Sequence, residues 1–319
     1  MTSTTLIWVG LLVFIVILLI FDLFVLHKKD EISNKKTARE TVFWILMALS
    51  QSILIYFIYK NNWLDNPTNL TPKNAVLKYV TGYFIELSLS VDNLFVIAMI
   101  FKSFNIPLKF QHKALFWGIL GAIIFRGAMI GIGVVLFQKV SWIPYVFGGF
   151  LIYTAFKMLY DELKGIPEEF NESKGKRIMR KYLRISPNLD GNKFFTLENG
   201  VRVATPLFGA LVMIEFTDIL FAVDSIPAIL AVTQDAFLVF CATIFATLGL
   251  RSMYFFLANM LEKFHYLHYS IFVILLYIGI KLILMHHYEI PELLSLAIIF
   301  VSLVGGVIVS LVKQNSAEA

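Results

Sequence analysis

The sequence predicts an all-α, polytopic membrane protein of about nine transmembrane helices. Three observations lead to this fold class. The 319-residue chain has a mean hydropathy of +0.77. Only 15% of its residues are charged, whereas soluble domains carry about a quarter. Several apolar stretches reach the roughly 20 residues that a helix needs to cross a hydrocarbon core.

Nine apolar stretches are expected to form the spans. They cover residues 6–26, 40–59, 79–101, 114–137, 142–161, 210–232, 236–258, 267–286 and 292–312. The first is expected to be a retained helix rather than a secretory signal, because Lys28 and Lys29 follow it and no basic residue precedes it. The chain then divides into two N-terminal helices (1–78), a three-helix unit (79–163), a basic cytoplasmic loop (164–205), a second three-helix unit (206–290), and a last helix with its tail (291–319).

The predicted loops differ strongly in their basic residues. With the N-terminus outside, the cytoplasmic segments hold nineteen Lys and Arg residues and the outer segments hold four. The positive-inside rule therefore predicts an outer N-terminus and a cytoplasmic C-terminus. This bias explains the formal net charge of +5, so membrane lipid is an expected partner and nucleic acid is not.

The loop 164–205 contains a predicted β-hairpin. Its segment KFFTLENGVRVA (193–204) alternates around Asn199-Gly200. An Asn-Gly pair between alternating strands is the strongest short-range hairpin signal.

The two three-helix units resemble each other. ELSLSVDN (86–93) aligns with DILFAVDS (218–225), so that Glu86 corresponds to Asp218. Further correspondences join Arg126 with Arg251 and Lys157 with Lys281. Because three spans reverse the direction of entry, the units are expected to be inverted repeats related by a pseudo-two-fold axis in the membrane plane. Many secondary transporters have this architecture, with the substrate site at the repeat interface.

Five acidic residues lie inside the third and sixth predicted spans: Glu86, Asp92, Glu215, Asp218 and Asp224. Each carboxylate costs roughly 2.5–3.5 kcal/mol at the centre of a membrane helix, so buried acids mark ion pathways by default. Pairing with buried arginines is the alternative, but Arg126 and Arg251 cannot neutralise five acids. Lys157 and Lys281 lie nearer span ends, where a long side chain can reach the membrane surface.

Carboxylate, amide and hydroxyl oxygens around these acids suit Mg²⁺, Ca²⁺ or Mn²⁺, whereas zinc and copper sites normally use His or Cys. The predicted metal ligands are Glu86, Asp92, Asn93, Asp218, Asp224 and Ser225. Glu215 is expected to relay a proton or guide the ion. Arg126 and Arg251 are expected beside this path, as structural counter-charges or as gates.

Helix geometry complicates this ligand set. Residues six apart lie about 120° from each other around a straight helix, so Glu86 and Asp92 would not converge on one ion. Either the carboxylates form stacked sites or the helices are interrupted. Because Pro227 follows Asp224 closely and proline removes a donor, interruptions are expected near 91–93 and 223–225.

No enzyme is expected. The chain lacks the G-x-x-x-x-G-K-[ST] phosphate loop, the H-E-x-x-H zinc motif and the G-x-S-x-G elbow. Asp92 and Asp224 could formally serve an aspartyl membrane protease, but the repeated flanking pattern fits ion coordination better. No organic cofactor is expected.

The segments IELSLSVDNLFV and VMIEFTDILFAVDSIPAILAVT, together with QHKALFWGILGAIIFRG and FGGFLIYTAFKML, resemble the TerC family of tellurium-resistance membrane proteins, which includes Alx-type manganese exporters. The resemblance implies a protein of the bacterial inner membrane that exports Mn²⁺. The family's motif residues correspond to Glu86, Asp92, Asn93, Glu215, Asp218, Asp224 and Ser225. Family members are also linked to tellurite tolerance and pH response.

The leading hypothesis is a secondary exporter of Mn²⁺, coupled to protons through the same carboxylates. A non-transporting metal sensor or scaffold is the first alternative. Export of another divalent cation such as Ca²⁺ is the second, because oxygen ligands alone do not separate these ions.

Overall fold

The computed structural model describes residues 3–22, 34–66, 69–164, 185–198, 200–258, 267–285, 287–288 and 290–317. These residues form ten helices and one two-stranded sheet. The helices are α1 (Ser3–Phe21), α2 (Asn34–Lys60), α3 (Pro72–Ser103), α4 (Leu108–Lys139), α5 (Ile143–Leu163), α7 (Pro206–Leu230), α8 (Ala236–Leu248), α9 (Leu250–Ala258), α10 (Leu267–Leu284) and α11 (Glu292–Ala317). The strands are β1 (Phe195–Glu198) and β2 (Val201–Ala204).

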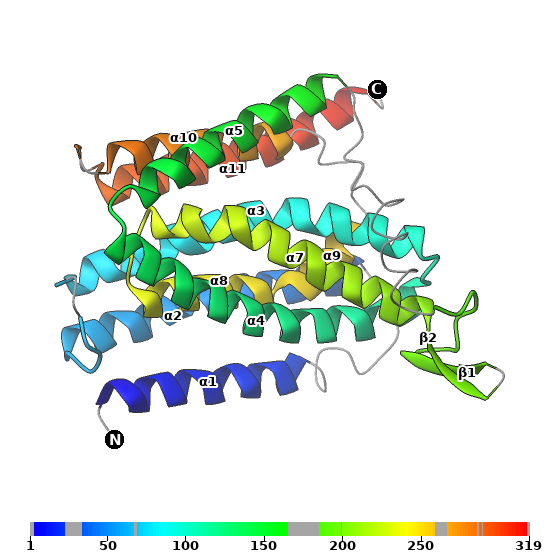
Figure 1. Cartoon of the computed structure of the whole chain (residues 1–319). Coiled ribbons are helices and arrows are strands. Elements are labelled where there is room, and N and C mark those ends of the chain that lie inside the picture. Colours follow the sequence, from blue (N-terminus) through cyan, green and yellow to red (C-terminus); the bar gives the residue numbers. More distant parts are fainter. Residues whose placement is uncertain are drawn as a thin grey trace.

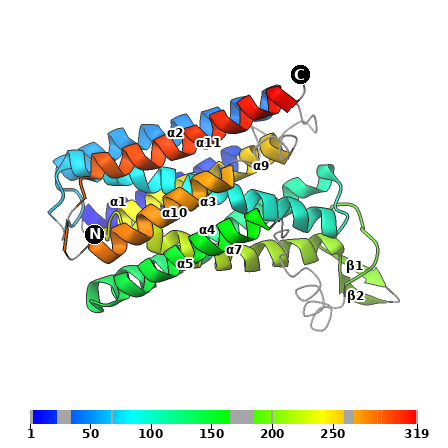
Figure 2. The same cartoon turned by 90° about the horizontal axis from the view of Figure 1, so that it is seen from above.

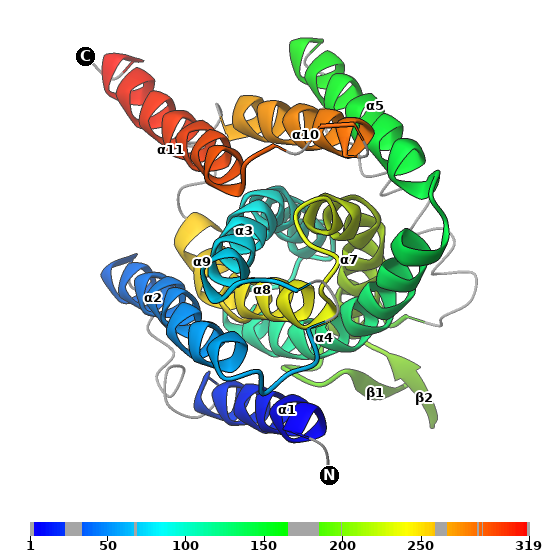
Figure 3. The ribbon, with the colours of Figure 1, turned by 90° about the vertical axis from the view of Figure 1, so that its left-hand side faces the viewer.

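A central bundle of α3, α4, α7 and the α8–α9 pair forms the core of the molecule (Figure 3). In this bundle α3 contacts both α7 and α8, and α4 contacts both α7 and α8. Helix α8 is the most completely buried, because almost all of its residues are covered. The remaining helices surround this core, so polar groups carried by α3, α4 and α7 can be shielded from lipid.

The outer helices cover two sides of the core (Figure 1). On one side α5, α10 and α11 form a layer, seen from above in Figure 2, and α11 also contacts α3. On the other side lie α2, which contacts α3 and α9, and α1. Aromatic contacts join α1 to α8, with Trp8 at 5.4 Å from Phe237 and Phe14 at 6.3 Å from Phe245 between ring centroids.

The backbones of α5 and α10 approach each other closely at two glycines. A β-carbon built on Gly148 would lie 2.8 Å from the Gly279 carbonyl oxygen, and one on Gly279 would lie 2.9 Å from the Gly148 carbonyl oxygen. Small residues permit such backbone approach between membrane helices. These two helices are the third members of the predicted repeat units, so the contact lies where the units would meet.

Local sequence explains how the two acid-bearing helices begin. Both start at a Thr-Pro pair: the Thr71 hydroxyl accepts from the Asn74 amide before α3, and the Thr205 hydroxyl accepts from the Phe208 amide before α7. Proline suits the first helical turn because its missing N–H has no partner there. The shared start agrees with the predicted repeat, and so does the reciprocal packing of α3 on α8 and α4 on α7. The inverted repeat itself stays a prediction.

Seven described helices are long and apolar enough to cross a membrane by length and composition. This confirms an all-α, polytopic membrane protein. Every one of the nine predicted spans falls on a helix, although the seventh is divided at Gly249 into α8 and α9. The count of nine spans stays a prediction.

The expected helix interruptions near 91–93 and 223–225 are wrong. Helix α3 is continuous from Pro72 to Ser103, and α7 is continuous from Pro206 to Leu230. Pro227 lies inside α7, in its last turn, and the donor that it lacks costs the helix one i→i−4 hydrogen bond without ending the helix there. The carboxylates are therefore carried at successive levels of continuous helices.

The predicted hairpin is confirmed. Strands β1 and β2 pair antiparallel, with Glu198 opposite Val201, and Gly200 has a φ of +78°. Beside it, hydrogen bonds from Lys193 and Thr196 hold the pKa of Asp190 below its usual range. The hairpin precedes α7 and lies at the opposite end of the bundle from the start of α1 (Figure 1). We call these the hairpin end and the N-terminal end.

Candidate ion site

An arginine at the centre of the bundle joins the two acid-bearing helices. Arg126 on α4 donates from Nε and Nη2 to the two carboxylate oxygens of Asp218 on α7, at 3.0 and 2.7 Å. Its Nη1 donates to Oε1 of Glu86 on α3. The Arg126 and Glu86 side chains are fully buried, and the Asp218 side chain is 14% exposed. We call these three residues the Arg126 triad. Two carboxylates facing one guanidinium leave the triad with a formal charge of −1.

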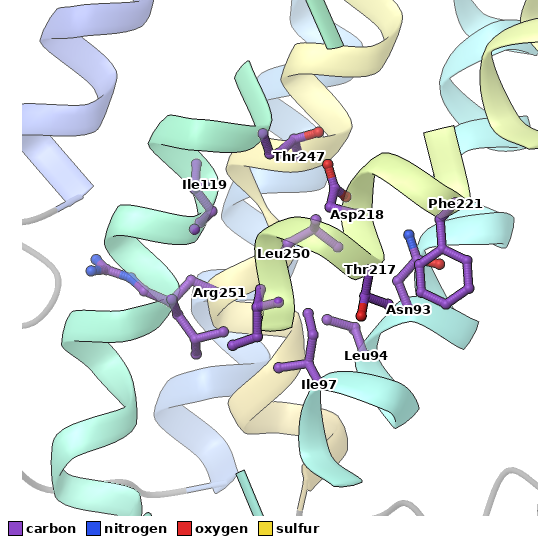
Figure 4. Close-up of a pocket in the computed structure, with 14 residues that line it drawn as sticks. Asn93, Leu94, Ile97, Ile119, Thr217, Asp218, Phe221, Thr247, Leu250 and Arg251 are labelled. Carbon is purple, nitrogen blue, oxygen red and sulfur yellow. The ribbon is translucent and has the colours of Figure 1, made fainter. Parts of the chain in front are cut away.

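A small cavity of about 30 Å³ lies beside the triad. Its polar lining comes from Asn93, Thr217, Asp218, Thr247 and Arg251 (Figure 4). A volume of this size has room for roughly two water molecules.

The direction of the helices places this cavity on the hairpin side of the triad. Its lining residues on α4, among them Leu115 and Gly118, precede Arg126, and α4 begins at the hairpin end (Figure 1). On α3, which runs the other way, Asn93 and Ile97 follow Glu86. The cavity therefore adjoins Asp218 from the hairpin end.

Several buried oxygens along the site have no hydrogen-bond partner among the described residues. They are Oε2 of Glu86, Oε2 of Glu215, Oδ1 of Asp224 and Oγ of Ser225. A buried polar atom without a partner loses its hydration with no compensation. Three of these four atoms are carboxylate oxygens, so the uncompensated groups favour a positively charged ligand.

The Glu215 carboxylate lies against Gly121 of α4. A β-carbon built on Gly121 would overlap the Glu215 carboxylate. Glu215 precedes Asp218 by three residues and is thus on the hairpin side of the triad, whereas Asp224 and Ser225 follow it toward the N-terminal end. At about 1.5 Å per residue, Glu215 and Asp224 are separated by about 13 Å along α7. The acids of α7 therefore lie at successive levels along the bundle, and Glu215 and Asp224 face opposite sides of the helix, because nine residues turn an α-helix by about 180° beyond two full turns.

The second buried arginine belongs to a different ion pair. Arg251 on α9 donates through Nη2 to Oδ2 of Asp22 at 2.6 Å and to the Asp22 carbonyl oxygen at 2.8 Å. Both side chains are almost fully buried. Although Arg251 contributes to the cavity wall, its guanidinium is directed away from Asp218 (Figure 4). Asp22 thus takes the charge of Arg251, and the five acids together with Asp22 exceed the two arginines by four formal charges.

At the N-terminal end of the bundle, polar contacts join α2 and α3 to the connection between α7 and α8. The Tyr59 hydroxyl donates to Oδ2 of Asp235 at 2.7 Å, and Nζ of Lys78 donates to the Val232 carbonyl oxygen at 2.8 Å. Asp235 also caps α8 by accepting from the amides of Phe237 and Leu238. These contacts join the helix ends at the N-terminal end of the bundle.

The structure brings together only part of the predicted ligand set. Glu86 and Asp218 meet at Arg126, and Asn93 adjoins them through the cavity wall. The Asp92 side chain lies outside the described part of the chain. Within that part, no three His, Cys, Asp or Glu side chains are grouped closely enough to hold a metal ion. The six-residue ligand set stays a prediction.

Some contributors could not be found from sequence patterns. Thr217 and Thr247 line the cavity. The Thr217 hydroxyl is among the oxygen donors that the sequence offers beside the acids, whereas the only sequence signal of Thr247 is a hydroxyl within an apolar span. Asp22, an acid near the end of the first predicted span, is 2% exposed. Lys281 does not reach the surface either, because it is 7% exposed and donates to Oγ of Ser295 at 3.0 Å.

Comparison with known proteins adds to this geometry. Residues 71–318 match the family described as the integral membrane protein TerC family. The chain belongs to the TerC family. The matched region contains the triad, the cavity-lining residues and the three acids of α7.

Relatives cover almost the whole length of this TerC protein. An uncharacterized membrane protein of Myxococcus xanthus is 41% identical over 97% of this chain and 93% of its own. A membrane protein of Rickettsia bellii is 40% identical over 98% and 99%. A protein of Escherichia coli named "Putative membrane-bound redox modulator Alx" is 38% identical over 93% and 92%. No solved structure matches the chain.

Proposed function

We propose that this TerC protein is a secondary transporter that exports Mn²⁺ across the bacterial inner membrane. The cation passes along the carboxylates of α3 and α7. The hairpin end faces the cytoplasm and the start of α1 lies outside. The observation that carries the proposal is the set of buried carboxylate oxygens without partners on Glu86, Glu215 and Asp224.

Charge supports a divalent cation as the substrate. The five acids of the two acid-bearing spans, together with Asp22, exceed Arg126 and Arg251 by four formal charges, and uncompensated charge within a membrane is costly. The donors are carboxylate, amide and hydroxyl oxygens, which suit Mn²⁺, Mg²⁺ and Ca²⁺. The resemblance to manganese exporters selects Mn²⁺ among them.

The proposed route begins at the hairpin end. Glu215 and the cavity beside Asp218 lie on that side of the triad, and Asp224 and Ser225 lie beyond it. The cation reaches Glu86 and Asp218 from the cytoplasm and leaves past Asp224. Export then requires an opening among the α2, α3 and α8 contacts of Tyr59 and Lys78.

The name of the E. coli relative refers to redox modulation. This chain contains one cysteine, Cys241, which is buried in α8. A single cysteine forms no disulfide within one chain, so this cysteine does not add a second proposal.

The test is Mn²⁺ flux in proteoliposomes, comparing the wild type with Asp92→Asn at equal amounts of folded protein. We expect wild-type flux and its loss in the variant, because the amide cannot supply the same charge to a cation. Tight Mn²⁺ binding by the wild type without flux would replace the proposal with a sensor or scaffold. Flux of Ca²⁺ but not Mn²⁺ would correct the ion, and equal flux with and without a pH gradient would remove proton coupling.

Gly121→Ala tests the role of Glu215 without removing the carboxylate. The new β-carbon displaces the flexible end of Glu215, while alanine stabilises a helix by about 0.5–1 kcal/mol relative to glycine. We therefore expect the unfolding midpoint to stay equal or rise slightly. Mn²⁺ flux should fall on the order of tenfold, since a catalytic or binding group moved by about 1 Å loses much of its effect.

Gly131→Ala is the matched control, because it lies on the same helix and a β-carbon there meets no atom within 4 Å. It should raise the unfolding midpoint similarly and leave the flux unchanged. Equal flux in the two variants would show that the position of the Glu215 carboxylate is unimportant for transport.

A further inference from the structure

The Arg126 guanidinium lies where a transported cation would be held. It contacts both carboxylates of the triad, one from each predicted repeat unit, and it is completely buried. Its two bonds to Asp218 form a fork that satisfies both carboxylate oxygens. On Glu86, Oε1 also accepts from Oγ of Ser90 at 3.3 Å, while Oε2 has no partner in the part of the chain that the structure describes.

The charges of the triad fit a dication better than a guanidinium. Glu86 and Asp218 together carry a formal charge of −2, of which Arg126 neutralises one. A divalent cation in the same place would neutralise both. The unpartnered Oε2 of Glu86 is the atom that such an ion would engage in addition.

The geometry of α4 also defines the direction in which the Arg126 side chain would move away from the carboxylates. Side chains on a helix lean toward its N-terminus, which for α4 is the hairpin end, where the cavity lies. One and two turns away on that face of α4 are Ala122 and Gly118, and both line the cavity. The face of α4 that leads from Arg126 to the cavity therefore carries small side chains, although the rest of the cavity lining is mostly large and apolar.

We propose that Arg126 is a tethered cation that alternates with the transported ion between Glu86 and Asp218. When the ion binds, the guanidinium withdraws over Ala122 and Gly118. When the ion leaves, the guanidinium returns and neutralises one of the two carboxylate charges, so that the empty transporter can change between its inward-facing and outward-facing states. This inference rests on the proposed transport function and describes how the same site is regulated.

The consequence is a difference between net transport and exchange. Net export requires the empty transporter to reorient, whereas exchange of external for internal Mn²⁺ uses only the ion-loaded form. Without Arg126 the empty site would hold two buried carboxylates with no counter-charge, and that state is strongly unfavourable. Net transport then depends on Arg126 and exchange does not.

The experiment compares wild type, Arg126→Gln, Arg126→Lys and Lys281→Gln in proteoliposomes. For each protein we would measure net ⁵⁴Mn²⁺ flux, ⁵⁴Mn²⁺/Mn²⁺ exchange and Mn²⁺ affinity. R126Q should lose net flux, keep exchange within a few-fold of wild type, and bind Mn²⁺ on the order of tenfold more tightly, a typical size for coupling between competing ligands. R126K should recover part of the net flux. K281Q removes a buried cation that bonds to Ser295 outside the site, and should resemble wild type in both assays.

Loss of flux and exchange together in folded R126Q, or unchanged net flux, would overturn the inference. If R126Q is folded in detergent but too unstable to reconstitute, its unfolding midpoint in detergent with and without Mn²⁺ decides: a larger stabilisation by Mn²⁺ than in wild type supports a tethered cation, and none contradicts it. Wild-type protein with neither flux nor exchange would instead refute the proposed function itself.

Discussion

Asp218→Ala is expected to lower the free energy of unfolding by about 3–5 kcal/mol, because it removes one partner of a buried ion pair and leaves Nε and Nη2 of Arg126 without their acceptors. Glu86 remains as the counter-charge of Arg126, but the guanidinium is fully buried and makes two of its three hydrogen bonds among the described residues to Asp218. Unfolding in detergent micelles, followed by circular dichroism, measures the change. Mn²⁺ flux in proteoliposomes should be abolished as well.

Asp190→Ala provides the matched control. Asp190 pairs with Lys193 at 3.0 Å, close to the 2.7 Å of the Arg126–Asp218 pair. Both side chains of the Asp190–Lys193 pair are exposed. Exposed pairs contribute little to stability, so the control should change neither stability nor flux. Similar midpoints for D218A and D190A would contradict a stabilising role for the buried triad.

The triple variant Glu86→Gln/Arg126→Met/Asp218→Leu separates stability from transport. Replacing a whole buried ion network by uncharged groups of similar volume is often neutral or stabilising. We therefore expect most of the stability lost in D218A to return, with no return of Mn²⁺ flux. A triple variant that still transports Mn²⁺ would remove the triad from the route.

Asp22→Ala is expected to lower the free energy of unfolding by about 3 kcal/mol. The carboxylate forms a 2.6 Å pair with Arg251, and both groups are buried. The backbone bond from Arg251 to the Asp22 carbonyl remains and offsets part of the loss. This pair links the end of α1 to α9, and the unfolding midpoint in detergent measures its contribution.

Asp22→Asn is the companion variant for that pair. The amide keeps an acceptor oxygen at the same place but removes the charge, so its midpoint should fall between those of wild type and D22A. If D22N were as unstable as D22A, the charge of Asp22 would account for the whole effect. If D22A were as stable as wild type, Asp22 would not anchor α1.

Local features of the sequence were sufficient for the fold class and for several elements. Hydropathy depends on composition within about 20 residues, so the spans, including those of α3 and α7, could be located one at a time. The hairpin followed from the Asn199-Gly200 turn for the same reason. The acids of α7 could also be identified, because a carboxylate within an apolar segment is visible without knowing its neighbours.

The expected interruptions failed because they depended on more than composition. A proline near an acid predicted a break of the helix at 223–225. Pro227 instead lies inside α7, which continues to Leu230. The real division, at Gly249 between α8 and α9, had no comparable signal.

The sequence by itself determined which charged residues enter the membrane helices of this TerC protein. Only the tertiary structure decided which of them meet. Arg126 and Arg251 correspond in the predicted repeat, yet Arg126 binds Glu86 and Asp218, while Arg251 binds Asp22. These partners are 40, 92 and 229 residues away along the chain. Pairing at such separations depends on how the helices pack, and the packing of α3 and α4 on α7, and of α1 outside the core, is a property of the whole bundle.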